Sequence, residues 1–128
     1  MKMQEITIPE KVKEIGKRDR NIIAVILFGS SLKGKGRDID LCFIMEPGLS
    51  KRKLLEKRIE YAGILGDRFD VQIFQILPLY IRIRVLKEGK IVFLRDEDKL
   101  YEIAFRTVRD FEYFRKYYEE YLRGVENV

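Results

Sequence analysis

Two short motifs lie close together in the chain and could do chemistry together. An apolar run ends in Gly29 and Ser30, and after a loop rich in Gly and Lys come Asp38 and Asp40. On a strand, residues two apart project from the same face, so both carboxylates would point toward one site. Neighbouring carboxylates repel each other unless a cation lies between them. The arrangement is suited to holding metal ions and phosphates together, which indicates nucleotide chemistry.

The expected cation is Mg²⁺, because it takes hard oxygen ligands and its coordination is commonly completed by substrate phosphates and water. A third carboxylate, Asp70, lies in a later segment of alternating polar and apolar residues, where it shares a face with Gln72. Three carboxylates can hold two metal ions about 3.5–4 Å apart, one activating the attacking oxygen and one neutralising the leaving phosphate. Asp38, Asp40 and Asp70 are therefore the candidate catalytic and metal-binding residues.

The loop between the two motifs could bind a triphosphate. Gly29 has no side chain where a phosphate chain must approach the backbone, and Ser30 offers a hydroxyl and an N–H donor there. Residues 31–37 add three cations and two more glycines, which suits a cover over the phosphates. The candidate nucleotide-binding residues are Gly29, Ser30, Ser31 and Lys33.

The amino-acid composition excludes several classes of catalysis and predicts the kind of partner and the cellular compartment. The chain has no histidine, which excludes Ser-His, Cys-His and most zinc chemistries. Its formal charge of +5 favours anionic partners such as nucleotides, RNA or an acidic protein face. A single cysteine, Cys42, and no apolar run long enough to span a bilayer lead us to expect a cytoplasmic protein that does not contact membranes. Abundant Lys, Glu and Arg with few Asn and Gln predict a thermophilic source.

The apolar periodicities predict a single domain over residues 1–128, with a core at about 10–95 and a C-terminal helix at about 98–123. We expect helices at 10–18, 50–65, 78–87 and 98–123, and strands at 22–28, 38–45, 68–76 and 90–94. The loop between the first two strands is too short for a crossover helix, so they should be antiparallel neighbours. This order describes an α/β or α+β domain with a small mixed sheet flanked by helices.

Two of the predicted helices carry more detailed expectations. In the 50–65 helix, Ser50 is the predicted N-cap, Gly66 the end, and the core side consists of Leu54, Leu55, Ile59, Ala62 and Leu65. The last helix, which we expect to end at Gly124, has apolar and aromatic residues at three- and four-residue steps. We interpret this stripe as mostly core, although residues 111–122 exceed what a small sheet covers and could bind a second subunit or a helical partner.

Residues 28–31 (Phe-Gly-Ser-Ser) and 38–40 (Asp-Ile-Asp) resemble the Gly-Ser and Asp-x-Asp signature of the minimal nucleotidyltransferases, the small branch of the DNA polymerase beta superfamily. Asp70 falls where that family places its third carboxylate. The resemblance implies the nucleotidyltransferase fold and transfer of AMP from ATP, with Mg²⁺, to an acceptor hydroxyl. It further implies that Gly29 and Ser30 bind the triphosphate, that Asp38 and Asp40 ligate both metals, and that Asp70 ligates the catalytic metal and helps to deprotonate the acceptor.

The same resemblance implies a protein partner. Minimal nucleotidyltransferases often form the antitoxin half of a pair with a helical HEPN-domain ribonuclease toxin, and they adenylylate a tyrosine of that toxin. By this resemblance, the chain is identified as a protein adenylyltransferase and antitoxin.

Three other interpretations fit parts of the sequence. A non-catalytic antitoxin would inhibit its partner by occlusion, but the intact carboxylates argue against it. A small RNA-binding module would fit the excess of basic over acidic residues. However, the chain lacks an aromatic RNA-stacking signature, so direct nucleic-acid binding is not expected. A structural interpretation, in which Asp38 caps a turn and Asp70 pairs with Arg68, leaves Asp40 unexplained, because Asp40 is flanked by Ile39 and Leu41 and would need a partner if buried.

Overall fold

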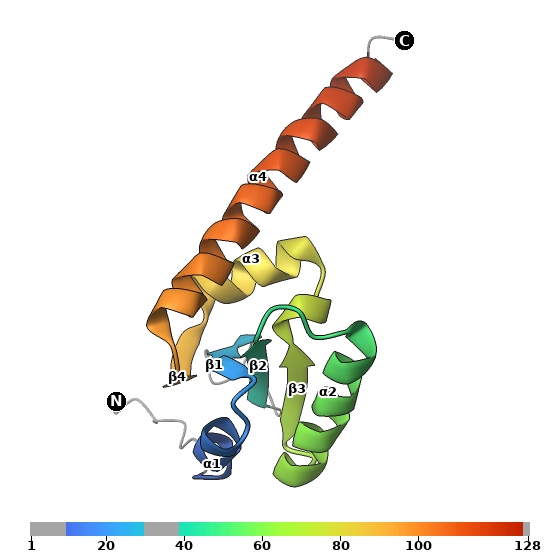
Figure 1. Cartoon of the computed structure of the whole chain (residues 1–128). Helices are drawn as coiled ribbons and strands as arrows, with labels where there is room; N and C mark the ends of the chain where they lie inside the picture. Colours follow the sequence, from blue (N-terminus) through green and yellow to red (C-terminus); the bar gives the residue numbers. More distant parts are fainter. Residues whose placement is uncertain (1–9, 30–38, 127–128) are drawn as a thin grey trace, which may run out of the picture.

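The computed structural model describes residues 10–29 and 39–126. Along the chain the elements are α1 (Glu10–Arg18), β1 (Ile22–Phe28), β2 (Ile39–Met45), α2 (Lys51–Leu65), β3 (Phe69–Ile73), the 3-10 helix η2 (Phe74–Ile76), α3 (Leu79–Glu88), β4 (Lys90–Leu94) and α4 (Glu97–Glu126) (Figure 1). Within these ranges, no helix combines the length and apolar character needed to cross a membrane.

The four strands form one mixed sheet in the order β3-β2-β1-β4. The central strand β1 is antiparallel to both of its neighbours, whereas β2 and β3 are parallel. Residues 22–27 of β1 are all buried, as a continuously apolar strand covered on both faces should be. The predicted mixed sheet and the predicted antiparallel pairing of the first two strands are therefore confirmed.

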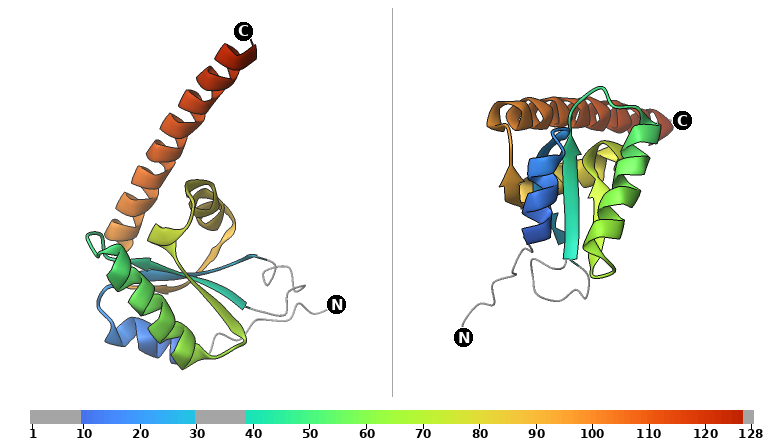
Figure 2. Two further views of the ribbon diagram at one scale, coloured as in Figure 1. Left: turned by 90° about the vertical axis from the view of Figure 1, so that its right-hand side faces the viewer. Right: turned by 60° about the horizontal axis from the view of Figure 1, so that its bottom comes forward.

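Helices cover the two faces of the sheet and divide the core into two clusters (Figure 2). On one face, α1 and α2 pack against the sheet, with Val12 and Tyr61 among the fully buried side chains. On the other face, Val85 of α3, Leu100 of α4 and Cys42 of β2 belong to one buried apolar cluster. Burial raises the pKa of the Cys42 thiol, so this cysteine is an inert packing residue, as its apolar neighbours predict.

The core side of α2 differs from the expectation. Ser50 caps the helix as predicted, accepting a hydrogen bond from the Lys53 N–H at 3.1 Å, and Gly66 ends it. Leu54 and Leu65 are buried, but Leu55 is 39% and Ile59 73% exposed, so these two assignments were wrong. The central core position belongs instead to Tyr61, whose ring stacks on Phe43 with centroids 4.7 Å apart. Apolar periodicity did not predict that Tyr61 is buried. Its polar hydroxyl can be buried because it has a hydrogen-bond partner distant in sequence, which periodicity does not reveal.

Strand β3 ends at Ile73, three residues before its predicted end. The reason is Gln75, which lies in the 3-10 helix and reaches the last residue of β2. Its side-chain Nε2 donates to the Met45 carbonyl at 2.7 Å, and its Oε1 accepts from the Met45 N–H at 3.2 Å. The amide side chain thus satisfies backbone groups that a longer strand would have paired. The chain is then free to turn toward α3.

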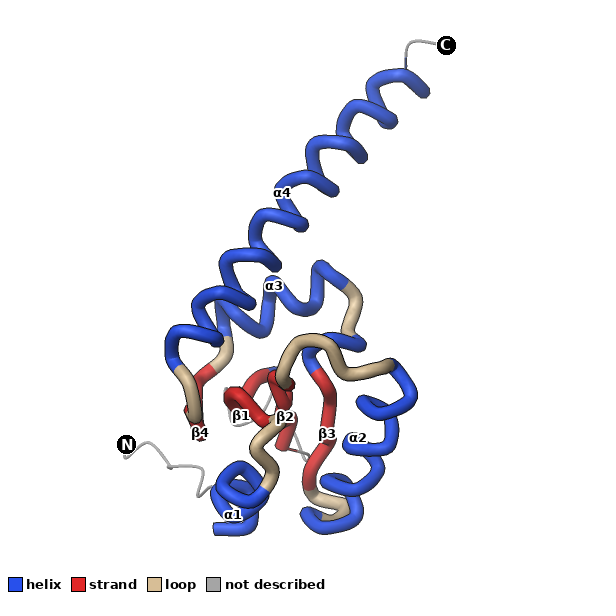
Figure 3. Tube along the Cα trace, in the orientation of Figure 1, coloured by secondary structure: helices blue, strands red, loops and turns tan. Residues whose placement is uncertain are grey.

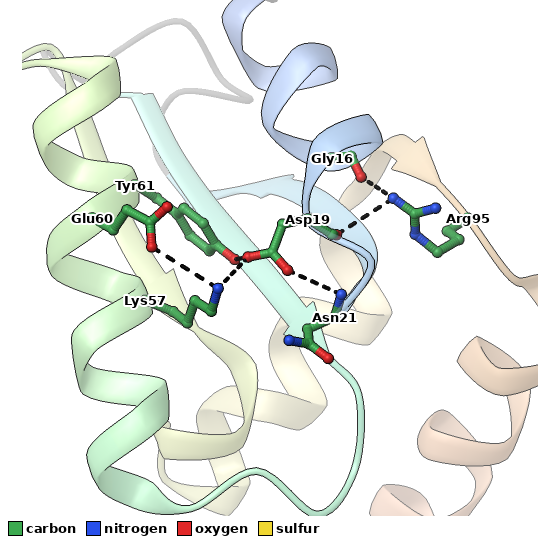
Figure 4. A network of polar contacts seen from close by, with 7 residues as sticks. All are labelled: Gly16, Asp19, Asn21, Lys57, Glu60, Tyr61 and Arg95. Carbon is green, nitrogen blue, oxygen red and sulfur yellow. Dashed lines mark hydrogen bonds and ion pairs between the residues drawn. The ribbon is translucent and has the colours of Figure 1, made fainter.

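The partner of Tyr61 is Asp19, in the turn between α1 and β1 (Figure 4). Its Oδ2 accepts from the Tyr61 hydroxyl at 2.5 Å and from Lys57 Nζ at 2.7 Å, and its Oδ1 accepts from the Asn21 N–H at 3.0 Å. Burial acts to raise the pKa of the Asp19 carboxyl, but these hydrogen bonds outweigh it and hold the pKa below its ordinary value of 3.8. This carboxylate ties the α1–β1 turn to α2.

We expect Asp19→Asn to destabilise the fold by about 1–3 kcal/mol at pH 7. Because the pKa of Asp19 is lower in the folded than in the unfolded chain, its contribution is complete above pH ~4 and is lost as the pH falls through the folded pKa. Urea unfolding at pH 7, 4 and 2.5 should show the difference from the native protein shrinking with pH. Asp67→Asn, at an exposed carboxylate, is the control. A difference that is constant with pH would contradict the assigned role of Asp19.

Candidate functional site

Three of the residues predicted to do chemistry come together at one end of the sheet. Gly29 follows the last residue of β1, and Asp40 is the second residue of β2. In the strand register, Asp40 is paired with Phe28 on one side and with Asp70 of β3 on the other. Paired residues of adjacent strands lie about 4.8 Å apart and project from the same face. The structure therefore places Asp40 and Asp70 next to each other, on one face of the sheet.

Gly29 lies directly against Asp40. Its φ of +83° is in the region that favours glycine, and a Cβ added at this position would overlap the Asp40 carboxylate. Sequence reasoning assigned Gly29 to phosphate binding alone. The structure adds a second role, because the missing side chain leaves room for the half-buried carboxylate of Asp40.

Asp70 is exposed, and its Oδ1 accepts a hydrogen bond from Gln72 Nε2 at 3.0 Å. The two side chains share a face of β3, as the alternating sequence predicts. In the described part of the chain the hydrogen-bond partner of Asp70 is thus Gln72, rather than Arg68. Gln72 was not recognised as a site residue; its two-residue spacing from Asp70 was the available signal.

The other predicted site residues, Ser30, Ser31, Lys33 and Asp38, lie outside the described residues, and their roles remain predictions. Within residues 10–29 and 39–126, no group of three or more His, Cys, Asp or Glu side chains could hold a metal ion. Asp40 and Asp70 nevertheless fit Mg²⁺ as a donor set, because this ion is commonly held by one or two carboxylates together with substrate phosphates. Two adjacent carboxylates on a partly exposed sheet end are also the kind of pair that a cation stabilises.

Two hollows of the described surface lie away from these carboxylates. One, of about 380 Å³, is lined by residues that include Glu46, Leu49 and Gln75, near the last residues of β2. The other, of about 310 Å³, lies beside Asp19 and Lys57. The first borders the ion pair between Glu46 and Lys99, and the second borders the Asp19 network. In the second hollow the carboxylates of Asp19 and Glu60 both contact Lys57, which balances their charge, so the sheet end remains the candidate site.

Residues 10–98 match the family model described as "Polymerase beta, Nucleotidyltransferase". The match covers most of the chain, which therefore belongs to this family and is a nucleotidyltransferase. The resemblance predicted from the Gly-Ser and Asp-x-Asp motifs is confirmed, and so is the predicted fold class, a mixed sheet flanked by helices with a long C-terminal helix.

The chain is also similar to individual relatives and to chains in solved structures. It is 36% identical over 97 residues to "Putative protein adenylyltransferase MJ1547" of Methanocaldococcus jannaschii, covering 71% of this chain and 73% of that protein. It is also similar to a chain in the crystal structure of a toxin–antitoxin with AMP-PNP (TM-score 0.67, 18% identity, covering 91% of this chain and 96% of that one). A complex of tri-AMPylated Shewanella oneidensis HEPN toxin with MNT antitoxin contains another similar chain (TM-score 0.61, 18% identity, 91% and 96% covered).

Replacing Gly29 by alanine tests the contact with Asp40. Gly48 is a matched control, because its φ is +98° but an added Cβ would meet nothing within 4 Å. Both Gly→Ala variants should lose about 1–2 kcal/mol from backbone strain, measured by urea unfolding. Gly29→Ala should lose more, since its methyl group displaces the Asp40 carboxylate. Equal losses in the two variants would show that Gly29 and Asp40 do not constrain each other.

Proposed function

We propose that this protein transfers AMP from ATP, in the presence of Mg²⁺, to a tyrosine hydroxyl of a helical HEPN-type toxin, and thereby acts as the antitoxin of the pair. The observation that carries the proposal is the register of β2, which puts Asp40 against Asp70 and beside Gly29. The printed names of the relatives support it: one is described as a protein adenylyltransferase, and two others come from toxin–antitoxin complexes, one with AMP-PNP and one with an AMPylated HEPN toxin.

The proposed division of labour follows from the chemistry of each side chain. Asp38, Asp40 and Asp70 would hold two Mg²⁺ ions, which, when bound, neutralise charge on the triphosphate and on the leaving pyrophosphate. Gly29, Ser30, Ser31 and Lys33 would bind the triphosphate. Gly29 leaves the backbone open to the phosphates, the hydroxyls donate to them, and the lysine offsets their charge.

The transfer itself is a displacement at the α-phosphorus of ATP. A bond forms between the tyrosine oxygen and this phosphorus, the bond from phosphorus to the bridging oxygen of the β-phosphate breaks, and pyrophosphate leaves. Asp70 would accept the phenolic proton, and the hydrogen bond from Gln72 would keep its carboxylate oriented. The whole chain would work as one nucleotidyltransferase domain, in the cytoplasm.

A second candidate, an antitoxin that only binds, is favoured by one observation. The last helix exposes a row of aromatic side chains that lies outside the candidate catalytic site and is suited to binding a protein. This function and adenylyl transfer make different predictions for a carboxylate variant.

The test is the double variant Asp38→Asn/Asp40→Asn, incubated with Mg²⁺-ATP and the HEPN toxin of its own genome. We expect AMP transfer, followed by the intact mass of the toxin, to fall at least about 10³-fold, because loss of two metal ligands removes most of the electrostatic stabilisation of the transition state. Folding, followed by circular dichroism, should be unchanged. Asp67→Asn, which alters an exposed carboxylate close in sequence to Asp70, is the matched control and should transfer normally.

Two outcomes would overturn the proposal. Unchanged transfer by the double variant would show that these carboxylates do not carry the reaction. A double variant that transfers nothing, yet still neutralises the toxin at a one-to-one ratio, would favour the antitoxin that only binds.

A further inference from the structure

The C-terminal three-fifths of α4, residues 109–126 and hereafter the distal helix, extends beyond the rest of the fold (Figures 1 and 3). The predicted end at Gly124 was wrong, since the helix continues to Glu126. The prediction that the stripe of α4 is mostly core was also wrong. Only Leu100 and Thr107 are buried, while the exposed large apolar side chains of the distal helix are Tyr113, Phe114, Tyr117, Tyr118, Tyr121, Leu122 and Val125. Such a continuous apolar surface is typical of an interaction site.

These side chains lie on one half of the helix. At about 100° per residue, together with the half-buried Phe111 they occupy an arc of roughly 180°, which we call the distal arc. Of the other residues, only Asp110 and Gly124 fall within it. The opposite half carries the charges, and there Arg115 pairs with Glu112 at 2.8 Å and with Glu119 at 3.0 Å. The charged half thus has partners within the helix, while the apolar half is uncovered.

The distal arc continues a packed face of the same helix. Leu100 and Ile103, which pack into the core cluster with α3, and the buried Thr107 fall on the same half of α4 as the distal arc. The sequence positions 100, 104, 107, 111, 114, 118, 121 and 125 alternate steps of four and three residues. The face that α3 and the sheet cover near the start of α4 therefore runs on without cover along the distal helix.

The width of the arc indicates the shape of its partner. One helix lying along another covers an apolar stripe of about 100°, so an arc of roughly 180° needs a groove between two helices. A second copy of this chain would offer only one matching distal helix. The surface is rich in tyrosine, whose ring is apolar while its hydroxyl can stay hydrated, a composition typical of protein–protein interfaces.

We propose that the distal arc is the docking surface for the acceptor protein, and that it inserts into a groove between two helices of that protein's helical bundle. This inference rests on the proposed function and names where its protein substrate is held. The core cluster that contains Leu100 also contains Cys42, which projects from the same sheet face as Asp40, two residues away. A bundle seated on the distal arc is therefore held on the side of the sheet that carries the candidate carboxylates.

Docking and chemistry lie on separate elements, which makes them separable by mutation. Phe114→Glu/Tyr118→Glu places two negative charges on the arc, at residues 56% and 51% exposed. Lys116→Glu changes the net charge by the same amount on the opposite half of the helix and is the matched control. Circular dichroism confirms that each variant keeps its helix content.

The probe is the HEPN toxin of its own genome, titrated into each protein by calorimetry without ATP and then used as acceptor with Mg²⁺-ATP. We expect the arc variant to bind the toxin at least about tenfold more weakly and to show a matching rise in KM for the toxin. Its kcat and its affinity for Mg²⁺-ATP should stay within about twofold of the native values. Lys116→Glu should match the native protein throughout.

Three results would overturn this inference. They are toxin binding that the arc variant retains, toxin binding absent from the native protein, and a change confined to self-association, measured by sedimentation. The last result would assign the arc to a second copy. A different result would contradict the proposed function alone: the native protein would bind the toxin through the arc but would neither bind ATP nor transfer AMP.

Discussion

The backbone pairing of β2 with two neighbours is the constraint on which the site depends. Its antiparallel register with β1 brings Asp40 beside Phe28 and Gly29, and its parallel register with β3 brings Asp40 beside Asp70. A shift of one residue in either register would turn a carboxylate to the opposite face of the sheet. The two like charges are adjacent because the surrounding apolar strands fix the register, and a cation between them would relieve their repulsion.

The face of the sheet that lies away from the candidate carboxylates contributes to that rigidity. Asp19, held by Lys57 and Tyr61, links α1 to α2 beneath the central strands. Burial first, and then the neighbouring carboxylate, raise the pKa of Tyr61, so its hydroxyl remains a hydrogen-bond donor to Asp19 throughout the physiological range. The candidate site and the Asp19 network thus lie on opposite faces of one sheet. The helix that we propose as the docking surface begins beside the carboxylate-bearing face and leads away from it.

Much of the fold could be predicted because its signals are local. The bounds of β1 and β4 were predicted correctly, since a β-branched apolar run and a Gly turn specify them, and Ser50 and Gly66 mark both ends of α2. The errors arose where a distant partner decides the structure. Tyr61 replaced Ile59 in the core because Asp19 accepts its hydroxyl, and Gln75 ended β3 early by bonding to Met45. Neither contact is visible in periodicity.

In the candidate site, too, features set by local sequence were predicted and features set by distant contacts were not. Spacing predicted that Asp38 and Asp40 point from one strand toward a common site, and Asp70 was proposed as a third carboxylate on a later strand. The parallel register of β2 and β3 pairs Asp40 with Asp70. The contact between Gly29 and Asp40 and the hydrogen bond from Gln72 depend on three-dimensional packing, so the sequence did not indicate them. For α4, periodicity correctly predicted an amphipathic helix. The same periodicity is found when the apolar face packs against its own chain and when it binds another protein, so the pattern did not reveal that this face is exposed.

The most direct test of the central claim is a crystal structure of the protein with Mn²⁺, as a substitute for Mg²⁺, and a non-hydrolysable ATP analogue, with the metal located by anomalous scattering. We predict manganese between the carboxylates of Asp40 and Asp70, with the triphosphate of the analogue passing Gly29. Manganese or nucleotide bound only at another part of the surface, with this end of the sheet vacant, would contradict the assignment of the site.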